Sequence, residues 1–156
     1  MDLEIHSRHG IHLQLNDRLF AFLVDSDGWD PGLFKRIMRR MGGTHVDALF
    51  LGMECHGAPL SWLYGPLLTK PISRRDDESR RLSGLDSERA WRVVQEFEAS
   101  RVFVYAMGQE PWLKYIMGLQ YRPDSVQLME VARFLERCEK SGVNAENLLL
   151  AREIEF

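Results

Sequence analysis

The sequence predicts an α/β fold in which a mixed β-sheet has helices packed on at least one face. The first observation is the apolar run of residues 19–24, which leads into the acidic, Gly- and Pro-containing segment 25–31. The second is the alternation of apolar and polar residues in segment 11–16. The third is the later alternation of strand-like apolar runs with segments of helical periodicity. Together they predict the order β-β-α-β-(irregular)-α-β-α-β in a single domain, residues 1–156.

The first two strands are predicted to form a hairpin. Ile11, Leu13 and Leu15 alternate with polar residues, which indicates a half-buried strand. Asn16-Asp17 is the expected turn, and residues 18–24 form the second strand. A buried strand that ends in acidic residues is where an open α/β sheet places its chemistry.

The next segment predicts a helix that begins at Asp30-Pro31, because Asp30 can cap free amides and Pro31 loses no useful donor at the first helical position. Gly42-Gly43 ends it. The buried stripe is expected to contain Leu33, Phe34, Ile37, Met38 and Met41, and the outer face Lys35, Arg36, Arg39 and Arg40.

After the third predicted strand, the composition of the chain changes twice, first to an apolar and then to a charged segment. That strand, residues 46–53, contains the continuous apolar run 48–51, which suits a strand covered on both faces. Residues 54–71 are apolar and aromatic but interrupted by Gly and Pro, which predicts a hydrophobic lid or an interface. Residues 73–81 are charged and self-neutralising, and they predict a solvated loop or a helix start.

The last third of the chain predicts two helices and two strands. One helix starts at Asp86 or Ser87, a strand covers residues 101–107, and a second helix runs from Asp124 or Ser125 to Ser141-Gly142. Residues 148–156 are predicted as the final strand. The expected buried positions are Trp91, Val94 and Phe97 in the first helix, and Val126, Met129, Phe134, Leu135 and Cys138 in the second.

Composition narrows the classes of protein that the chain can represent. The apolar fraction of 45% and the charged fraction of 28% are ordinary for a folded domain. The net charge of −3 does not favour nucleic acid or a membrane as a partner, and no apolar stretch is long enough to span a bilayer. Cys55 and Cys138 are expected to be reduced thiols in a cytoplasmic protein, and the acidic N-terminus does not resemble a signal peptide.

Two acids and three histidines are the first candidates for chemistry. Asp25 and Asp27 follow a buried strand and could ligate a metal or act as a general base, whereas the structural alternative is that one of them caps a turn. His6, His9 and His12 are spaced by three, and this odd spacing on a strand alternates between faces, so all three cannot easily ligate one ion. His9 and His12 are expected on a solvent-exposed strand face. His6 precedes the strand, where a ligand is better placed.

Two further sequence patterns could indicate a functional site but are better explained by structural roles. Cys55 and His56 could form a thiol nucleophile and its base, but adjacent residues on an extended backbone point apart and no third residue orients the base. The basic helix 31–41 could meet a phosphate backbone, yet such a face is more often the solvated side of an amphipathic helix.

The run from His6 to Ser26 resembles the second half of a metallo-β-lactamase-fold protein, in which a histidine precedes a hairpin whose second strand ends at a metal-bridging aspartate. His6 and Asp25 match these two positions. The stretches 51–67 and 105–112 are similar to the C-terminal catalytic region of the diiron β-hydroxylases of nonribosomal peptide assembly. These enzymes hydroxylate an amino acid held on a carrier protein. The resemblance implies one half of an αββα sandwich.

Several family features are missing from the sequence. The superfamily's His-x-His-x-Asp-His motif is absent, and no histidine stands near Met107-Gly108, where the last superfamily histidine would fall. The β-hydroxylase branch lacks that histidine too, and it uses a glutamate where His6 matches, so Glu4 is an alternative ligand. Asp25 and His6 cannot hold two metals by themselves, because each metal needs several ligands.

The leading hypothesis is a half-domain that contributes Asp25 and His6 to a dinuclear site, hydroxylase-like or hydrolase-like. Two divalent metal ions, iron or zinc, would be completed by residues outside this chain, so we expect the chain alone to be inactive. The partner would be a missing N-terminal half, a partner subunit or a second copy. The alternative is a non-catalytic protein-interaction module with a degenerate metal site, in which segment 54–68 is the interface.

Overall fold

The computed structural model describes residues 10–24, 26, 28, 30–40, 42–43, 45–55, 60–61, 65–77, 84–115 and 121–156. Within these ranges, no helix has the length and apolar character needed to cross a membrane. The strands are β1 (Gly10–Leu15), β2 (Arg18–Leu23), β3 (Ala48–Gly52), β4 (Arg101–Tyr105) and β5 (Asn144–Asn147). The helices are α1 (Pro31–Arg40), α3 (Arg74–Asp77), α4 (Ser87–Phe97) and α5 (Val126–Lys140), with short 3₁₀ turns at Gly65–Leu67 and Leu113–Tyr115.

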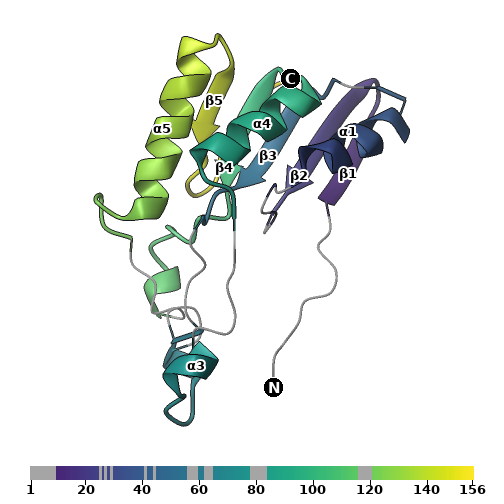
Figure 1. Cartoon of the computed structure of the whole chain (residues 1–156). Coiled ribbons are helices and arrows are strands. Elements are labelled where there is room, and N and C mark those ends of the chain that lie inside the picture. Colours follow the sequence, from purple (N-terminus) through teal and green to yellow (C-terminus); the bar gives the residue numbers. More distant parts are fainter. Residues whose placement is uncertain are drawn as a thin grey trace.

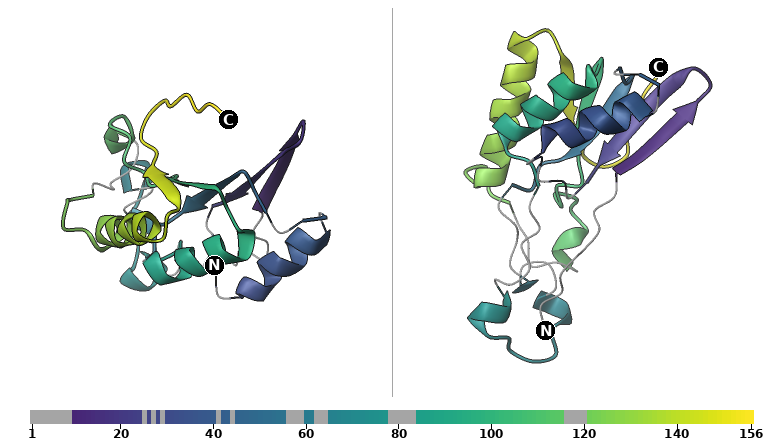
Figure 2. Two further views of the ribbon diagram at one scale, coloured as in Figure 1. Left: turned by 90° about the horizontal axis from the view of Figure 1, so that it is seen from above. Right: turned by 45° about the vertical axis from the view of Figure 1, so that its right-hand side comes forward.

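The five strands form one mixed sheet in the order β1-β2-β3-β4-β5, which confirms the predicted fold class. β1 is antiparallel to β2, and β2 to β5 are parallel to one another. Because each successive parallel strand is added on the same side, the crossover helices α1, α4 and α5 all lie on one face of the sheet (Figure 1). The view from above shows the C-terminal segment on the opposite side of the sheet from these helices (Figure 2, left).

The helix-covered face contains the main hydrophobic core. Leu49 and Leu51 of β3 and Val102 and Val104 of β4 are fully buried against the helices, which is why β3 is covered as its apolar run predicted. The helices contribute Phe34 and Met38 from α1, Ala90, Val93, Val94 and Phe97 from α4, and Val131, Phe134 and Cys138 from α5.

The opposite face carries a row of aromatic side chains. Phe22 stacks on Phe50 with ring centroids 4.3 Å apart, and Phe50 stacks on Phe103 at 4.9 Å. These rings occupy paired positions of neighbouring strands, where cross-strand side chains meet. This second cluster is smaller than the first: Phe20, Phe50 and Phe103 are at most 9% exposed, and Phe22 and Tyr105 are partly buried.

The C-terminal segment corrects the predicted final strand. β5 is Asn144–Asn147, and residues 148–156 form no regular element. Phe156 instead packs edge-on against Phe20 at 4.9 Å, and Arg101 Nη1 donates to the Glu155 carbonyl at 2.6 Å. Leu148, Ile154 and Phe156 of this segment therefore pack on the aromatic row rather than in a strand.

Strand β1 also differs from expectation in the direction of its apolar side chains. Ile11, Leu13 and Leu15 are exposed, because their register with β2 puts them on the open face beside Phe20 and Phe22. The expectation that His12 faces solvent is wrong: it is half-buried on the helix side and stacks on Phe97 at 6.1 Å. Burial lowers the pKa of His12 from its usual value.

The observed ends of the helices agree with the prediction more closely than the observed buried positions do. Asp86 caps α4 by accepting from the Arg89 amide at 2.8 Å, and α5 ends at Ser141 before Gly142. However, Leu33, Val126 and Met129 are exposed and Trp91 is only partly buried, because each lies about 100° or more around its helix from the residues that face the sheet.

Candidate functional site

The carboxyl ends of β2, β3, β4 and β5 meet at one edge of the sheet, which is the expected place for chemistry in an open α/β fold. Asp25 follows β2 at this edge in the sequence, between the described Val24 and Ser26. Asp25 itself, His6, Glu4, Asp27 and His9 lie outside the described residues. The predicted ligand pair is therefore neither supported nor contradicted by the described geometry.

The loop after β2 is anchored by a glycine. Gly28 has a φ of +62°, a conformation that suits glycine, and a Cβ there would lie 2.5 Å from Leu85 Cδ2. The loop therefore passes tightly over the start of α4. It ends at Asp30, whose carboxylate accepts from Arg36 Nη2 at 3.0 Å and whose carbonyl accepts from the Leu33 amide at 3.0 Å.

Glu54 is the described acid most deeply placed at this edge. It is only 9% exposed, it lies two residues after the end of β3, and the Tyr121 hydroxyl donates a hydrogen bond to its Oε1. Burial first, and then the hydrogen bond with Glu54, raise the pKa of Tyr121 well above its usual value. The Gly84 amide donates to the Glu54 carbonyl at 2.7 Å, and the Leu85 amide donates to the Gly52 carbonyl at 3.2 Å. Two segments distant in the sequence, Gly84-Leu85 and Tyr121, thus converge on the end of β3.

Cys55 lies beside this acid but is not an activated thiol. It is buried, and desolvation raises its pKa to about 11, so the neutral form dominates near pH 7. His56, its suggested base, lies outside the described residues. The geometry of Cys55 accordingly disfavours the nucleophile hypothesis.

The ends of β4 and β5 carry a pair of side-chain amides. Asn147 Nδ2 donates to Gln109 Oε1 at 3.1 Å, and Asn147 Oδ1 is buried without a hydrogen-bond partner. Ala106 and Gly108 both have positive φ, at 56° and 66°, where the chain turns from β4 towards Gln109. Sequence reasoning missed both amides, because neither residue type at that spacing indicates a particular chemistry.

The described residues do not by themselves fit a metal centre. No group of three or more His, Cys, Asp or Glu side chains that could hold an ion occurs among them. Both ring nitrogens of His45 have hydrogen-bond partners within the fold: Nδ1 lies 2.8 Å from the Glu98 carbonyl oxygen, and Nε2 lies 3.2 Å from Ser100 Oγ. A dinuclear centre would therefore need ligands from beyond this described set.

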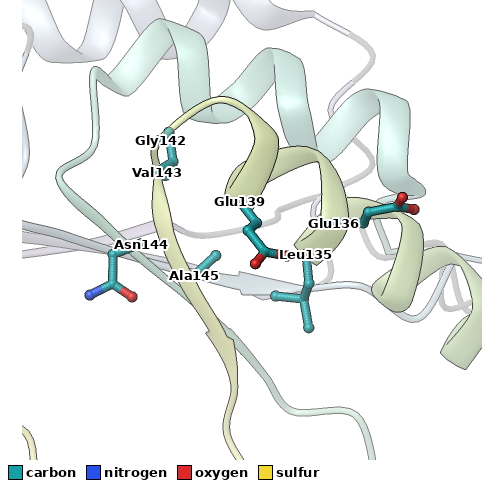
Figure 3. A pocket seen from close by; sticks show the side chains of 7 residues that line it. All are labelled: Leu135, Glu136, Glu139, Gly142, Val143, Asn144 and Ala145. Atoms are coloured by element: carbon teal, nitrogen blue, oxygen red, sulfur yellow. The ribbon is translucent and has the colours of Figure 1, made fainter.

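A surface groove lies away from this edge (Figure 3). It has a volume of about 560 Å³ and lies between the end of α5 and the start of β5. Because β5 begins there, the groove is at the amino-terminal edge of the parallel strands and is separate from the candidate site. Its lining residues are Leu135, Glu136, Glu139, Gly142, Val143, Asn144 and Ala145.

Comparison with known proteins gives two consistent similarities, although no family model matches the chain. The sequence is 35% identical over 153 residues to the 4-amino-L-phenylalanyl-[CmlP-peptidyl-carrier-protein] 3-hydroxylase of Streptomyces venezuelae, covering 98% of this chain and 28% of the relative. The crystal structure of CmlA, a diiron β-hydroxylase from the same organism, aligns with a TM-score of 0.80 at 35% identity, over 99% of this chain and 29% of that one. An E→D mutant of CmlA aligns with a TM-score of 0.73. The chain thus spans less than a third of these proteins.

Proposed function

We propose that the chain, which is similar to a segment of the diiron β-hydroxylase CmlA, is the C-terminal half of a metallo-β-lactamase-like domain and contributes to a dinuclear iron site of a hydroxylase-like protein. Asp25 would be the bridging carboxylate and His6, or Glu4 in its place, a terminal ligand. The remaining ligands would come from a second polypeptide segment, because two residues cannot satisfy two metal ions.

The observation that carries this proposal is the apolar face of the sheet opposite the helices, which is exposed at β1. A largely parallel sheet is normally covered on both faces, yet all the described crossover helices lie on one side (Figure 2, left). On the other side, Ile11, Leu13 and Leu15 extend the aromatic row as exposed side chains. A second β-sheet packed on this face would bury them and would form the two-sheet sandwich that the homology implies.

The substrate in this proposal follows the similarity to the hydroxylase. That relative acts on a 4-amino-L-phenylalanyl group attached to a peptidyl carrier protein. We propose the same class for the protein that contains this chain: an aminoacyl group held on a carrier protein.

Metal analysis tests the proposal. The chain is purified alone and together with the N-terminal region of CmlA that this chain does not match, and each sample is assayed for iron and zinc. We expect stoichiometric iron only in the complex. Absence of metal from a stable complex would contradict the proposal. Full metal content in the isolated chain would contradict the claim that a second segment supplies the remaining ligands.

The exposed apolar face also favours a second candidate, a non-catalytic interaction module whose metal site has degenerated. Here the open face would bind a second copy of the chain. Light scattering with metal analysis separates the two: a metal-free homodimer that does not accept the N-terminal region favours the module. A complex with the N-terminal region that contains metal excludes it.

A further inference from the structure

Helix α1 presents the most strongly basic surface of the helix layer. Its outer side exposes Lys35, Arg36, Arg39 and Arg40 within three turns, although the whole chain has a net charge of −3. Arg36 pairs with Asp30 at 3.0 Å, and Lys35 lies 3.8 Å from Glu96. Neither Arg39 nor Arg40 has an acidic partner in the described part of the chain. The positive charge is therefore only partly neutralised.

An apolar side chain interrupts this basic surface. Leu33 is 46% exposed, although its position in the sequence favoured burial. It lies three residues before Arg36 and seven before Arg40, so these three side chains follow one line along the helix. A solvated helix face gains nothing from such a leucine, whereas a docking surface gains an apolar contact surrounded by charge.

The position of α1 relates this surface to the candidate site. α1 starts at Pro31, six residues after Asp25, and therefore begins near the carboxyl edge of the sheet. Its ten residues span about 15 Å, so the whole face lies within about 20 Å of that edge.

We propose that the outer face of α1, defined by Leu33, Arg36, Arg39 and Arg40, is the docking surface for an acidic carrier-protein domain. The inference rests on the proposed function, which supplies the class of partner. Charge complementarity would steer the encounter, and Leu33 would contact an apolar residue of the carrier helix at the centre of the interface. The partially free guanidinium groups of Arg39 and Arg40 would pair with its carboxylates.

A binding titration tests this surface. The full chain is titrated with the isolated holo form of the peptidyl carrier protein of the Streptomyces venezuelae relative, labelled for fluorescence anisotropy. We expect binding that weakens as salt rises to about 0.5 M. The double substitution Arg36→Glu and Arg40→Glu should weaken it at least about tenfold and remove most of the salt dependence. Leu33→Ser should weaken binding without changing the salt dependence.

The control is Arg75→Glu, which changes the charge of an exposed arginine on α3, a helix distant from α1 (Figure 1). It should bind the carrier like the unmodified chain. Undiminished binding by the double variant, no binding by the unmodified chain, or equal loss in the Arg75 variant would overturn the proposal. Tighter binding of a DNA duplex than of the carrier would also overturn it. Iron in the complex with the N-terminal region, but no carrier binding, would reject only this surface and leave the proposed function standing.

Discussion

At the scale of single residues, the contact between Tyr121 and Glu54 joins the carboxyl end of β3 to the segment that leads into α5. The two residues are 67 positions apart, and both are at least partly buried. A hydroxyl that donates to a buried carboxylate makes a charge-assisted bond, which is stronger than a bond between neutral groups. We therefore expect this contact to stabilise the candidate site's local structure.

Tyr121→Phe removes that donor while keeping the ring. The free energy of unfolding should fall by about 1.5–3 kcal/mol, the usual contribution of a hydrogen bond to a charged group. Urea denaturation followed by circular dichroism measures it. Tyr115→Phe is the matched control, since Tyr115 is 75% exposed, and it should leave stability unchanged. Equal effects from the two substitutions would show that the Tyr121 hydroxyl contributes nothing.

The two buried thiols predict a loss of stability in alkali. Burial raises the pKa of Cys55 and of Cys138 from 9.0 to about 11. Above pH 9 the thiols of the unfolded chain lose protons while those of the folded chain retain them, so the unfolded state binds fewer protons and the folded state loses stability up to pH 11. Cys55→Ala with Cys138→Ala should flatten this part of the stability profile. An unchanged slope would contradict the assignment.

At the scale of elements, the segment before α4 fixes the end of β3 through backbone contacts. Gly84 approaches so closely that a Cβ on it would lie 2.5 Å from the Glu54 backbone nitrogen. A side chain there must displace backbone rather than a flexible side-chain end. Glycine is needed at this position for close approach, which explains how the strand end and the helix start are held together.

Gly84→Ala should lower the free energy of unfolding by about 1–3 kcal/mol, the typical cost of overpacking. Gly43→Ala is the control, because a Cβ at Gly43 meets nothing within 4 Å. That substitution should be neutral or slightly stabilising, since it reduces the freedom of the unfolded chain. Thermal unfolding of both variants gives the comparison, and a stable Gly84 variant would exclude the close contact.

The order of the elements was largely predictable from sequence, and the exceptions have physical causes. The hairpin, the Asp86 cap and the Ser141-Gly142 stop follow from local periodicity and capping. β5 was missed because Asn144–Asn147 is polar and joins the sheet through backbone pairing with β4. The apolar residues of segment 148–156 indicated a strand, but Leu148, Ile154 and Phe156 pack on a sheet face instead.

The candidate site was less predictable than the fold. An acid after an apolar strand is a local signal, and it identifies Glu54 as readily as Asp25. Its partner Tyr121 depends on a contact across 67 residues, which no local pattern contains. The faces of β1 were also misjudged, because alternation shows that a strand has two faces without showing which one the helices cover.

At the scale of the whole molecule, the C-terminal segment covers part of the open face. Phe156 contacts Phe20, and the Arg101 guanidinium lies 4.9 Å from the Phe156 ring centroid. Phe156→Ala should lower the free energy of unfolding by about 0.5–1.5 kcal/mol through loss of the ring contacts. Leu150→Ala is the control, because Leu150 is exposed. Urea unfolding compares them, and equal stability of both variants would show that the segment is not anchored by its last residue.

The central claim is that Asp25 ligates metal in a site shared between this chain and a second segment. Its most direct test is the iron content of the complex with the N-terminal region of CmlA, measured for the unmodified chain, Asp25→Ala and Asp27→Ala. We predict about two irons per complex for the unmodified chain and for Asp27→Ala. Asp25→Ala should lose iron while circular dichroism shows a retained fold. Full iron content in the Asp25 variant, or loss of its fold together with the metal, would contradict the claim.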